Sequence, residues 1–280
     1  MASRRHLSPT QTNMWSRCPR QYAFRYEEGI KSPPSGAMKQ SGVAHLAYEK
    51  NYRQKAETRT DLPVDEMTDF YADTWDKELT REEVVFDKGE TAGSLKDQGV
   101  KIVKAHRVGI SPLVMPASAD SVERKVSFTL KESDTFDIMG VIDVIDEQGY
   151  IRDNKSLARQ PSPLDLAKDG QLSMYALLYR LTERKAETGL KIDAVIKNKE
   201  PRAIILPAER TREMLQLHLN KVGHIARAIE HHIFPLNTDG WHCDPRYCGY
   251  WDRCVGKSLK TVDMGQNLEQ QLKESLDNAN

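Results

Sequence analysis

The spacing of apolar residues along the chain changes from a helical period to an alternating one and back again. Helices are expected at 8–26, with a break near Cys18-Pro19, and at 37–55, 64–84, 94–108, 164–182 and 209–232. Strands are expected at 122–130, 136–146, 150–155, 192–196 and 203–206, the first three of them sequential and antiparallel. The order α, βββ, α, ββ, α predicts an α/β (α+β) fold in which helices cover a sheet.

Length and charge set broad limits on the protein. Its 280 residues, 39% of them hydrophobic, suffice for one large domain or two small ones. Lys and Arg together number 41, as do Asp and Glu, so a polyanion must be bound by a local patch rather than by the field of the whole protein. The opening residues Met1 to His6 lead into no apolar stretch, and no run approaches the roughly 20 apolar residues of a membrane span. We therefore expect a cytoplasmic protein that does not enter a membrane.

The most informative segment is the predicted hairpin whose strands carry Asp143 and Asp153. If Glu147 to Gly149 form a three-residue loop with the glycine in the left-handed conformation, positions equally far from the loop lie opposite one another. Asp143 then faces Asp153, with Cβ atoms about 4.5–5.5 Å apart, and such like charges destabilise a hairpin unless a cation bridges them. The period of two puts Lys155 on the face of Asp153 and turns Asn154 to the other face.

Two carboxylates and an ammonium group at one place suit phosphodiester hydrolysis. Mg²⁺ takes oxygen ligands and is commonly held by one or two carboxylates together with phosphate oxygens of the substrate. The metal would polarise the phosphoryl oxygen and lower the pKa of a bound water, and Lys155 would orient that water. Two alternatives stay open: an ordinary solvent-facing strand pair, and a two-residue turn at Gln148-Gly149 that shifts the pairing by one.

Three further side chains could complete such a site. Gln171 and Tyr175 are four residues apart in a predicted helix, so they project from one face and could orient a phosphate or a base. His45 lies among apolar neighbours in another predicted helix and could supply a third metal ligand. Each also has an ordinary interpretation: a tyrosine at the edge of the core beside a solvated glutamine, and a buried histidine with its hydrogen bonds satisfied.

The four cysteines are arranged as one plus three. Cys18 is followed by 224 residues without cysteine, and then Cys243, Cys248 and Cys254 form a C-x4-C-x5-C run. Four thiolates suit an iron-sulfur cluster or a tetrahedral zinc ion. Zinc sites usually pair their cysteines at close spacing, so this arrangement favours a cluster that closes a very long loop. Zinc and four unrelated thiols stay open as alternatives, whereas a disulfide is disfavoured in the cytosol.

Together these motifs resemble the PD-(D/E)XK nucleases, and within them the RecB-like iron-sulfur exonucleases, which include the CRISPR-associated exonuclease family and its phage relatives. The resemblance covers roughly Leu7 to Cys254 in the order of the family's motifs. The matching motifs are Cys18-Pro19-Arg20-Gln21-Tyr22, His45, Gly140-Val141-Ile142-Asp143, Asp153-Asn154-Lys155, Gln171-Leu172-Ser173-Met174-Tyr175 and the final cysteine trio. The chain departs from the family in having Ile142-Asp143 in place of Pro-Asp, and in the wide first gap of its cysteine trio.

This resemblance implies a mixed central sheet flanked by helices and cleavage of DNA, most typically exonuclease action on single strands or ends. It also implies dependence on Mg²⁺ or Mn²⁺, bound by His45, Asp143, Asp153 and the backbone carbonyl of Asn154. Lys155, Gln171 and Tyr175 would act beside the metal. The resemblance further implies a 4Fe-4S cluster on the four cysteines, and protein partners in recombination, repair or spacer acquisition.

The expected organisation is one nuclease domain over 1–258, followed by a polar, frayed or disordered tail over 259–280. Within the domain, a cluster subdomain would be formed by about 7–30 and 236–258, and the nuclease core by about 37–232. Two other functions stay open. One is a DNA-end-binding module for recombination or integration with little activity of its own, and the other is a zinc-stapled nucleic-acid-binding protein.

Overall fold

The computed structural model describes residues 4–131 and 133–256 and divides the chain into two compact units. Unit 1 contains the described residues up to Ser16 together with Pro33–Ile233. Unit 2 contains Arg17–Ser32 and the described residues from Phe234 onward, and therefore all four cysteines. The tail predicted over 259–280 lies outside the described residues.

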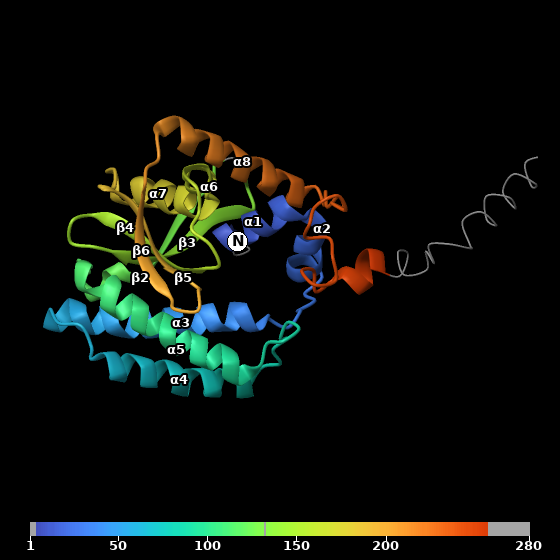
Figure 1. The fold of residues 1–280 in the computed structure, drawn as a ribbon. Coiled ribbons are helices and arrows are strands. Elements are labelled where there is room, and N and C mark those ends of the chain that lie inside the picture. Colours follow the sequence, from blue (N-terminus) through green and yellow to red (C-terminus); the bar gives the residue numbers. More distant parts are fainter. Residues whose placement is uncertain (1–3, 132, 257–280) are drawn as a thin grey trace, which may run out of the picture. The chain divides into compact units, whose positions relative to one another are not determined.

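A six-stranded mixed sheet forms the centre of unit 1 (Figure 1). Its strands are β1 (Arg5–Leu7), β2 (Val122–Thr129), β3 (Phe136–Ile145), β4 (Tyr150–Leu157), β5 (Gly189–Ile196) and β6 (Arg202–Ala208). As predicted, β2, β3 and β4 are sequential and antiparallel, and β5 and β6 are also antiparallel. The pairs β1–β3 and β4–β5 are parallel. The apolar pattern missed β1, because only Leu7 of its three residues is buried.

Strand β3 is the branching point of the sheet. It pairs with β2 along most of its length, so β1 and β4 must share its other edge. On that edge β1 pairs with residues 136–138 and β4 with residues 144–145. In the sheet as described, the stretch 139–143 between them has no strand partner on this edge. Strands β3 and β4 therefore separate immediately after the hairpin, and Asp143 lies where they separate.

Helices cover both faces of this sheet (Figure 1). On one face are α3 (Gly36–Thr58), α4 (Val64–Arg81) and α5 (Ala92–Gly109), and on the other are α6 (Pro163–Lys168), α7 (Gly170–Glu183) and α8 (Arg212–Glu230). The core under the first face includes Val122, Val144 and Val195 of the sheet, packed with apolar side chains of α3, α4 and α5. None of the helices described for residues 4–131 and 133–256 combines the length and apolar character needed to span a bilayer.

One predicted helix proved to be two. The helix expected over 164–182 is divided between α6 and α7 at Asp169, which has an extended backbone. The Asp169 carboxylate accepts hydrogen bonds from the backbone N–H groups of Gln171 and Leu172, at 2.8 and 2.9 Å. This N-cap stabilises the start of α7 and thereby fixes where Gln171 projects.

Unit 2 is built from two segments that are far apart in the sequence. It contains the end of α1 (Pro9–Arg17), the helix α2 (Pro19–Tyr22) and the π-helical turns η1 (Ala23–Glu27) and η4 (Asp252–Gly256), and the expected break near Cys18-Pro19 separates α1 from α2. The rings of Phe24 and Tyr250 stack with centroids 5.4 Å apart. The Tyr250 hydroxyl donates to the carbonyl of Ile30 at 2.9 Å. Aromatic stacking and a side-chain-to-backbone hydrogen bond therefore join the two segments.

Candidate active site

The hairpin between β3 and β4 has the predicted register. Val144 pairs with Arg152, and the loop ends at Gly149 with a φ of 83°, so the alternative two-residue turn is wrong. This register sets Asp143 across from Asp153, but the strand ladder ends one pair earlier. Asp143 Oδ2 instead accepts a hydrogen bond from the backbone N–H of Asn154 at 2.8 Å. A side chain thus takes the place of a strand-to-strand hydrogen bond.

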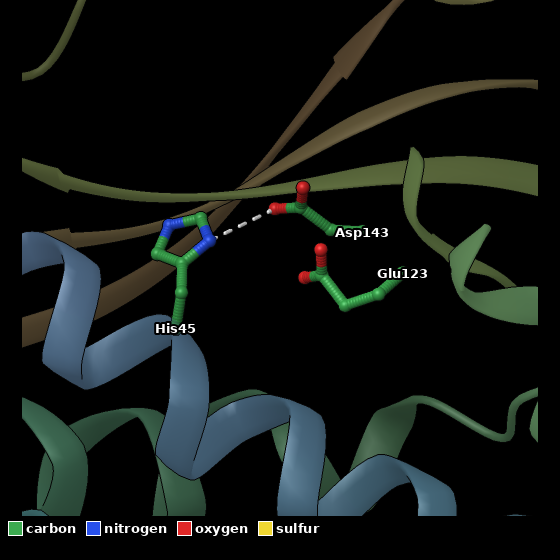
Figure 2. Close-up of side chains that lie close together, drawn as sticks. All are labelled: His45, Glu123 and Asp143. Atoms are coloured by element: carbon green, nitrogen blue, oxygen red, sulfur yellow. Dashed lines mark ion pairs between the residues drawn. The ribbon is translucent and has the colours of Figure 1, made fainter. Parts of the chain in front are cut away.

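A histidine and two carboxylates meet at this opening of the sheet (Figure 2). His45 of α3, Glu123 of β2 and Asp143 of β3 each offer a ligand atom, and these atoms all lie within 4.8 Å of one another. His45 Nδ1 is 3.5 Å from Asp143 Oδ2. Imidazole nitrogen and carboxylate oxygen are donors that divalent cations such as Mn²⁺ accept. These three side chains could therefore hold a metal ion.

Glu123 is the member of this group that sequence reasoning missed. The β2–β3 pairs on either side of it are Val122 with Val144 and Arg124 with Ile142, and they set Glu123 across from Asp143. The ladder skips that one pair, and Glu123 has a φ of 50°, a left-handed conformation that is rare for glutamate. Only the pairing of β2 with β3 reveals this position, and that pairing crosses a loop whose geometry the apolar pattern does not predict.

The positive charge near the carboxylates of the site is too small to offset their burial and mutual repulsion. Burial, with Asp143 and Glu49 nearby, raises the pKa of Glu123 to about 8. Burial also raises the pKa of Asp153 to about 7, and Asp143 adds to the rise although Lys155 opposes it. A carboxylate that resists ionisation in this way gains most from a nearby cation. The local electrostatics therefore fit a divalent metal ion.

A second set of predicted residues forms a hydrogen-bonded network on the α7 side of the sheet. Lys155 Nζ is 2.7 Å from Asp153 Oδ2 and donates to Gln171 Oε1 at 3.0 Å. Gln171 Nε2 donates to Asp153 Oδ1 at 3.0 Å and to the Tyr175 hydroxyl oxygen at 2.8 Å. Gln171 therefore ties the lysine, the aspartate and the tyrosine together.

Lys155 keeps its charge in this network. Burial would lower the pKa of Lys155, but the carboxylates of Asp153 and Asp169 outweigh it, so the pKa is raised. The side chain is still 21% exposed, whereas that of Asp153 is 1% exposed. Lys155 is thus a protonated amine that is both fixed in place and accessible to a ligand.

The structure separates the predicted metal ligands into two neighbouring sets. Within the part of the chain that is described, the ligand atoms of Asp153 do not join the group of His45, Glu123 and Asp143. Its two oxygens face Lys155 and Gln171 instead. The Asn154 side chain points to the other face of the sheet, as predicted, and lies against His106 of α5. Whether one cation engages both aspartates and the Asn154 carbonyl stays a prediction.

The four cysteines of unit 2 line one pocket, together with Phe24, Tyr250 and Trp251 among others. All four are free thiols, and burial raises the pKa of Cys243, Cys248 and Cys254. Among the described residues no three of these sulfurs lie within 4.8 Å of one another. A tetrahedral zinc ion with bonds of about 2.3 Å would need sulfurs roughly 3.8 Å apart. The thiols are therefore gathered around one space, but more widely than zinc requires.

The comparisons with known proteins agree with this geometry. The family model of the PD-(D/E)XK nuclease superfamily matches residues 6–255. The chain belongs to the PD-(D/E)XK nuclease superfamily. Nucleases of this superfamily use divalent metals, and the His45 group is a place for one. The predicted family and fold class are thereby confirmed.

A solved structure shows the same fold. The nuclease is similar to a protein of Eubacterium rectale named "Putative exonuclease", with a TM-score of 0.52 and 12% sequence identity. The similarity covers 85% of this chain and 86% of that chain. At this identity it concerns the fold and not the substrate. No curated protein matches the chain.

Proposed function

We propose that this nuclease hydrolyses phosphodiester bonds of DNA with Mg²⁺ or Mn²⁺, and that it acts as an exonuclease on single strands or DNA ends. The observation that carries the proposal is the set of side chains gathered where β3 and β4 separate. A donor group of His45, Glu123 and Asp143 lies there beside a protonated lysine held by Asp153 and Gln171. This combination offers a metal site and a fixed cation to one phosphate.

The metal would be held by His45, Glu123 and Asp143, joined by Asp153 and the backbone carbonyl of Asn154 as the family resemblance implies. A bound divalent cation supplies a Lewis acid for the phosphoryl oxygen and lowers the pKa of a coordinated water. The protein itself contributes the fixed orientation of the ligand side chains. The Asn154 N–H orients the Asp143 carboxylate, and this bond leaves lone pairs of Asp143 for a cation.

Lys155 would orient the attacking water and stabilise the charge that develops on the phosphate. Its ammonium group is held by Asp153 and Gln171, so little reorganisation is needed when substrate binds. Burial raises the pKa of Tyr175, so its hydroxyl stays protonated. That hydroxyl accepts a hydrogen bond from Gln171 and keeps its own proton for a phosphate or base of the DNA.

The test is the degradation of end-labelled single-stranded and double-stranded DNA with Mg²⁺, Mn²⁺ or a chelator, beside the Asp143→Asn variant. We expect metal-dependent cleavage of linear DNA that the variant loses, and resistance of circular single strands, because an exonuclease needs an end. Cleavage of circles would replace exonuclease by endonuclease action. Binding without cleavage under every condition would contradict the proposal and favour the DNA-end-binding module.

The four cysteines are proposed to hold a 4Fe-4S cluster that joins the two segments of unit 2. Their convergence on one pocket supports this, and so does a sulfur spacing wider than a zinc ion needs. Anaerobically purified protein should be brown and contain iron and sulfide. Colourless protein with stoichiometric zinc would contradict this proposal without affecting the nuclease.

A further inference from the structure

On the face of the sheet covered by α3 and α5, a series of buried side-chain hydrogen bonds links Asn154, His106 and Ser111. Its centre is His106 of α5, which is fully buried. His106 Nε2 lies 2.9 Å from Asn154 Oδ1. An amide oxygen only accepts, so Nε2 carries the hydrogen and donates it. Nδ1, at 3.3 Å from the Ser111 hydroxyl, then accepts from it.

The imidazole ring of His106 is itself held firmly. It stacks on the ring of Tyr48 with centroids 3.7 Å apart and planes 17° from parallel, and Tyr52 meets it edge-on at 5.9 Å. Tyr48 belongs to α3 and is three residues from His45, so both project from neighbouring positions of one helix. His106 therefore contacts α3, which carries His45, through Tyr48, and β4, whose backbone N–H at Asn154 orients Asp143, through the Asn154 side chain.

At Asn154, β4 is paired with β5 on one edge but has no strand partner on the edge that faces Asp143. The ladder with β3 ends before this residue, and the Asn154 N–H donates to the Asp143 carboxylate rather than to the backbone of β3. The backbone position of Asn154 thus decides where the Asp143 carboxylate lies. The contact with His106 anchors the Asn154 side chain on the opposite face.

We infer that His106 is a positioning residue of the metal site. Through its hydrogen bond to Asn154 it fixes the backbone amide that orients Asp143, and through its stacking on Tyr48 it fixes the helix that carries His45. The inference rests on the proposed metal-binding function of that site. Groups that are hydrogen-bonded to metal ligands typically contribute 10–100-fold to metal affinity. His106 acts one step further back, through Asn154, so we expect its contribution at the lower end of that range.

The competing explanation is that His106 only fills the core. The two explanations differ in what a phenylalanine would do there. His106→Phe keeps an aromatic ring for the stack on Tyr48 but removes the hydrogen bond to Asn154. Asn154→Leu removes the same bond from its other end. A matched control is Trp75→Phe, because Trp75 is a buried core residue of α4 and lies in no strand of the sheet.

The measurement is Mn²⁺ affinity without DNA, by electron paramagnetic resonance of free Mn²⁺, together with the midpoint of thermal unfolding. We expect His106→Phe and Asn154→Leu each to weaken Mn²⁺ binding by about tenfold, the lower end of the range for hydrogen-bond partners of metal ligands. The double variant should bind Mn²⁺ little more weakly than the worse of the two single variants, because both substitutions remove the same hydrogen bond. Trp75→Phe should lower the unfolding midpoint without changing Mn²⁺ affinity. His106→Gln, which keeps an N–H donor, should recover part of the loss.

Wild-type Mn²⁺ affinity in His106→Phe would overturn the inference, and so would a loss no larger than that of Trp75→Phe. If His106→Phe does not fold, wild-type affinity in Asn154→Leu would overturn it equally. Failure of the unsubstituted protein to bind Mn²⁺ would instead contradict the proposed metal site itself. The two failures are therefore distinguishable in one experiment.

Discussion

The two groups of chemically active side chains in this nuclease are held in different ways. In unit 1, Lys155, Asp153, Gln171 and Tyr175 are joined by ion pairs and hydrogen bonds. Asp143 is fixed by a backbone amide. In unit 2, the four cysteines line one pocket, but no hydrogen bond joins one described cysteine side chain to another. Hydrogen bonds and ion pairs fix the side chains of the first group to one another, whereas the cysteines share only the lining of a pocket.

This difference indicates what each site requires in order to form. In unit 1, hydrogen bonds and ion pairs to the strands and helices of a well-packed core position the side chains, so a metal would add chemistry to a site that the fold itself frames. Unit 2 joins two segments that are far apart in the sequence, and the binding free energy of a cluster that links them would contribute directly to its folding. Removing a group should therefore affect mainly activity in unit 1 and mainly structure in unit 2.

The largest expected effect is on catalysis in unit 1. Lys155→Met should lower kcat by about 10²–10³-fold, because it removes a preorganised cation from the phosphate. DNA binding should survive, since the fold and the other contacts remain. Single-turnover cleavage and fluorescence anisotropy measure the two effects. Lys125→Met, on the exposed side of β2, is the control and should behave as wild type.

The next effect is on structure in unit 2. Cys18→Ala should abolish the visible absorbance of the cluster and expose the segment after Phe234 to protease, because one of its four anchors is lost. Circular dichroism of unit 1 should change little. Trp241→Ala is the control, since this exposed side chain belongs to the same unit but does not line the cysteine pocket. An unchanged spectrum in Cys18→Ala would contradict the four-cysteine site.

A smaller effect is expected when pH changes the charge of unit 1. The folded-state pKa values of Glu123 and Asp153 lie above their ordinary values, at about 8 and about 7, so the metal-free fold binds protons more tightly than the unfolded chain does. Their contribution destabilises the metal-free protein most above pH 8, and this destabilisation is relieved progressively as pH falls from about 8 towards the ordinary carboxyl pKa values near 4. The thermal midpoint without metal should rise over that interval.

Metal binding should show the opposite pH dependence, because a cation must displace these protons. As pH falls below the pKa of a ligand carboxyl, Mn²⁺ affinity should weaken by about tenfold per pH unit for each proton that the cation must displace. Glu123→Gln should remove the part of this dependence near pH 8, as calorimetry at several pH values would show. The exposed Glu200→Gln serves as control. A pH profile that Glu123→Gln leaves unchanged would place Glu123 outside the metal site.

The smallest expected effect concerns the hairpin that frames the site. Gly149 has a φ of 83°, and an added Cβ would lie 2.8 Å from the Thr188 hydroxyl oxygen. Gly149→Ala should destabilise unit 1 by about 1–3 kcal/mol in chemical denaturation, with Mn²⁺ affinity nearly unchanged. Gly89→Ala measures the cost of the left-handed backbone alone, because Gly89 has a φ of 88° and open space at its Cβ. The difference between the two variants is then the cost of the contact with Thr188. Equal losses in both variants would show that the Thr188 contact costs nothing.

What the sequence predicted well is local in the chain. The hairpin register followed from alternation and one glycine, and it placed Lys155 with Asp153 and turned Asn154 away. The positions that were missed depend on distant pairing. Glu123 requires the register of β2 on β3 and a left-handed residue within the strand. The interruption at Asp169 was missed because the apolar period continues across it, while the cap that divides the helix is a single side chain.

The two-segment construction of unit 2 also sets the order in which the chain can mature. Cys18 leaves the ribosome 225 residues before Cys243. At 5–20 residues per second that interval lasts roughly 10–50 s. All described parts of unit 1 have been synthesised by its end, since they stop at Ile233. The catalytic sheet can therefore fold while Cys18 still lacks its partners, and closure of the cysteine pocket is a late step of biosynthesis.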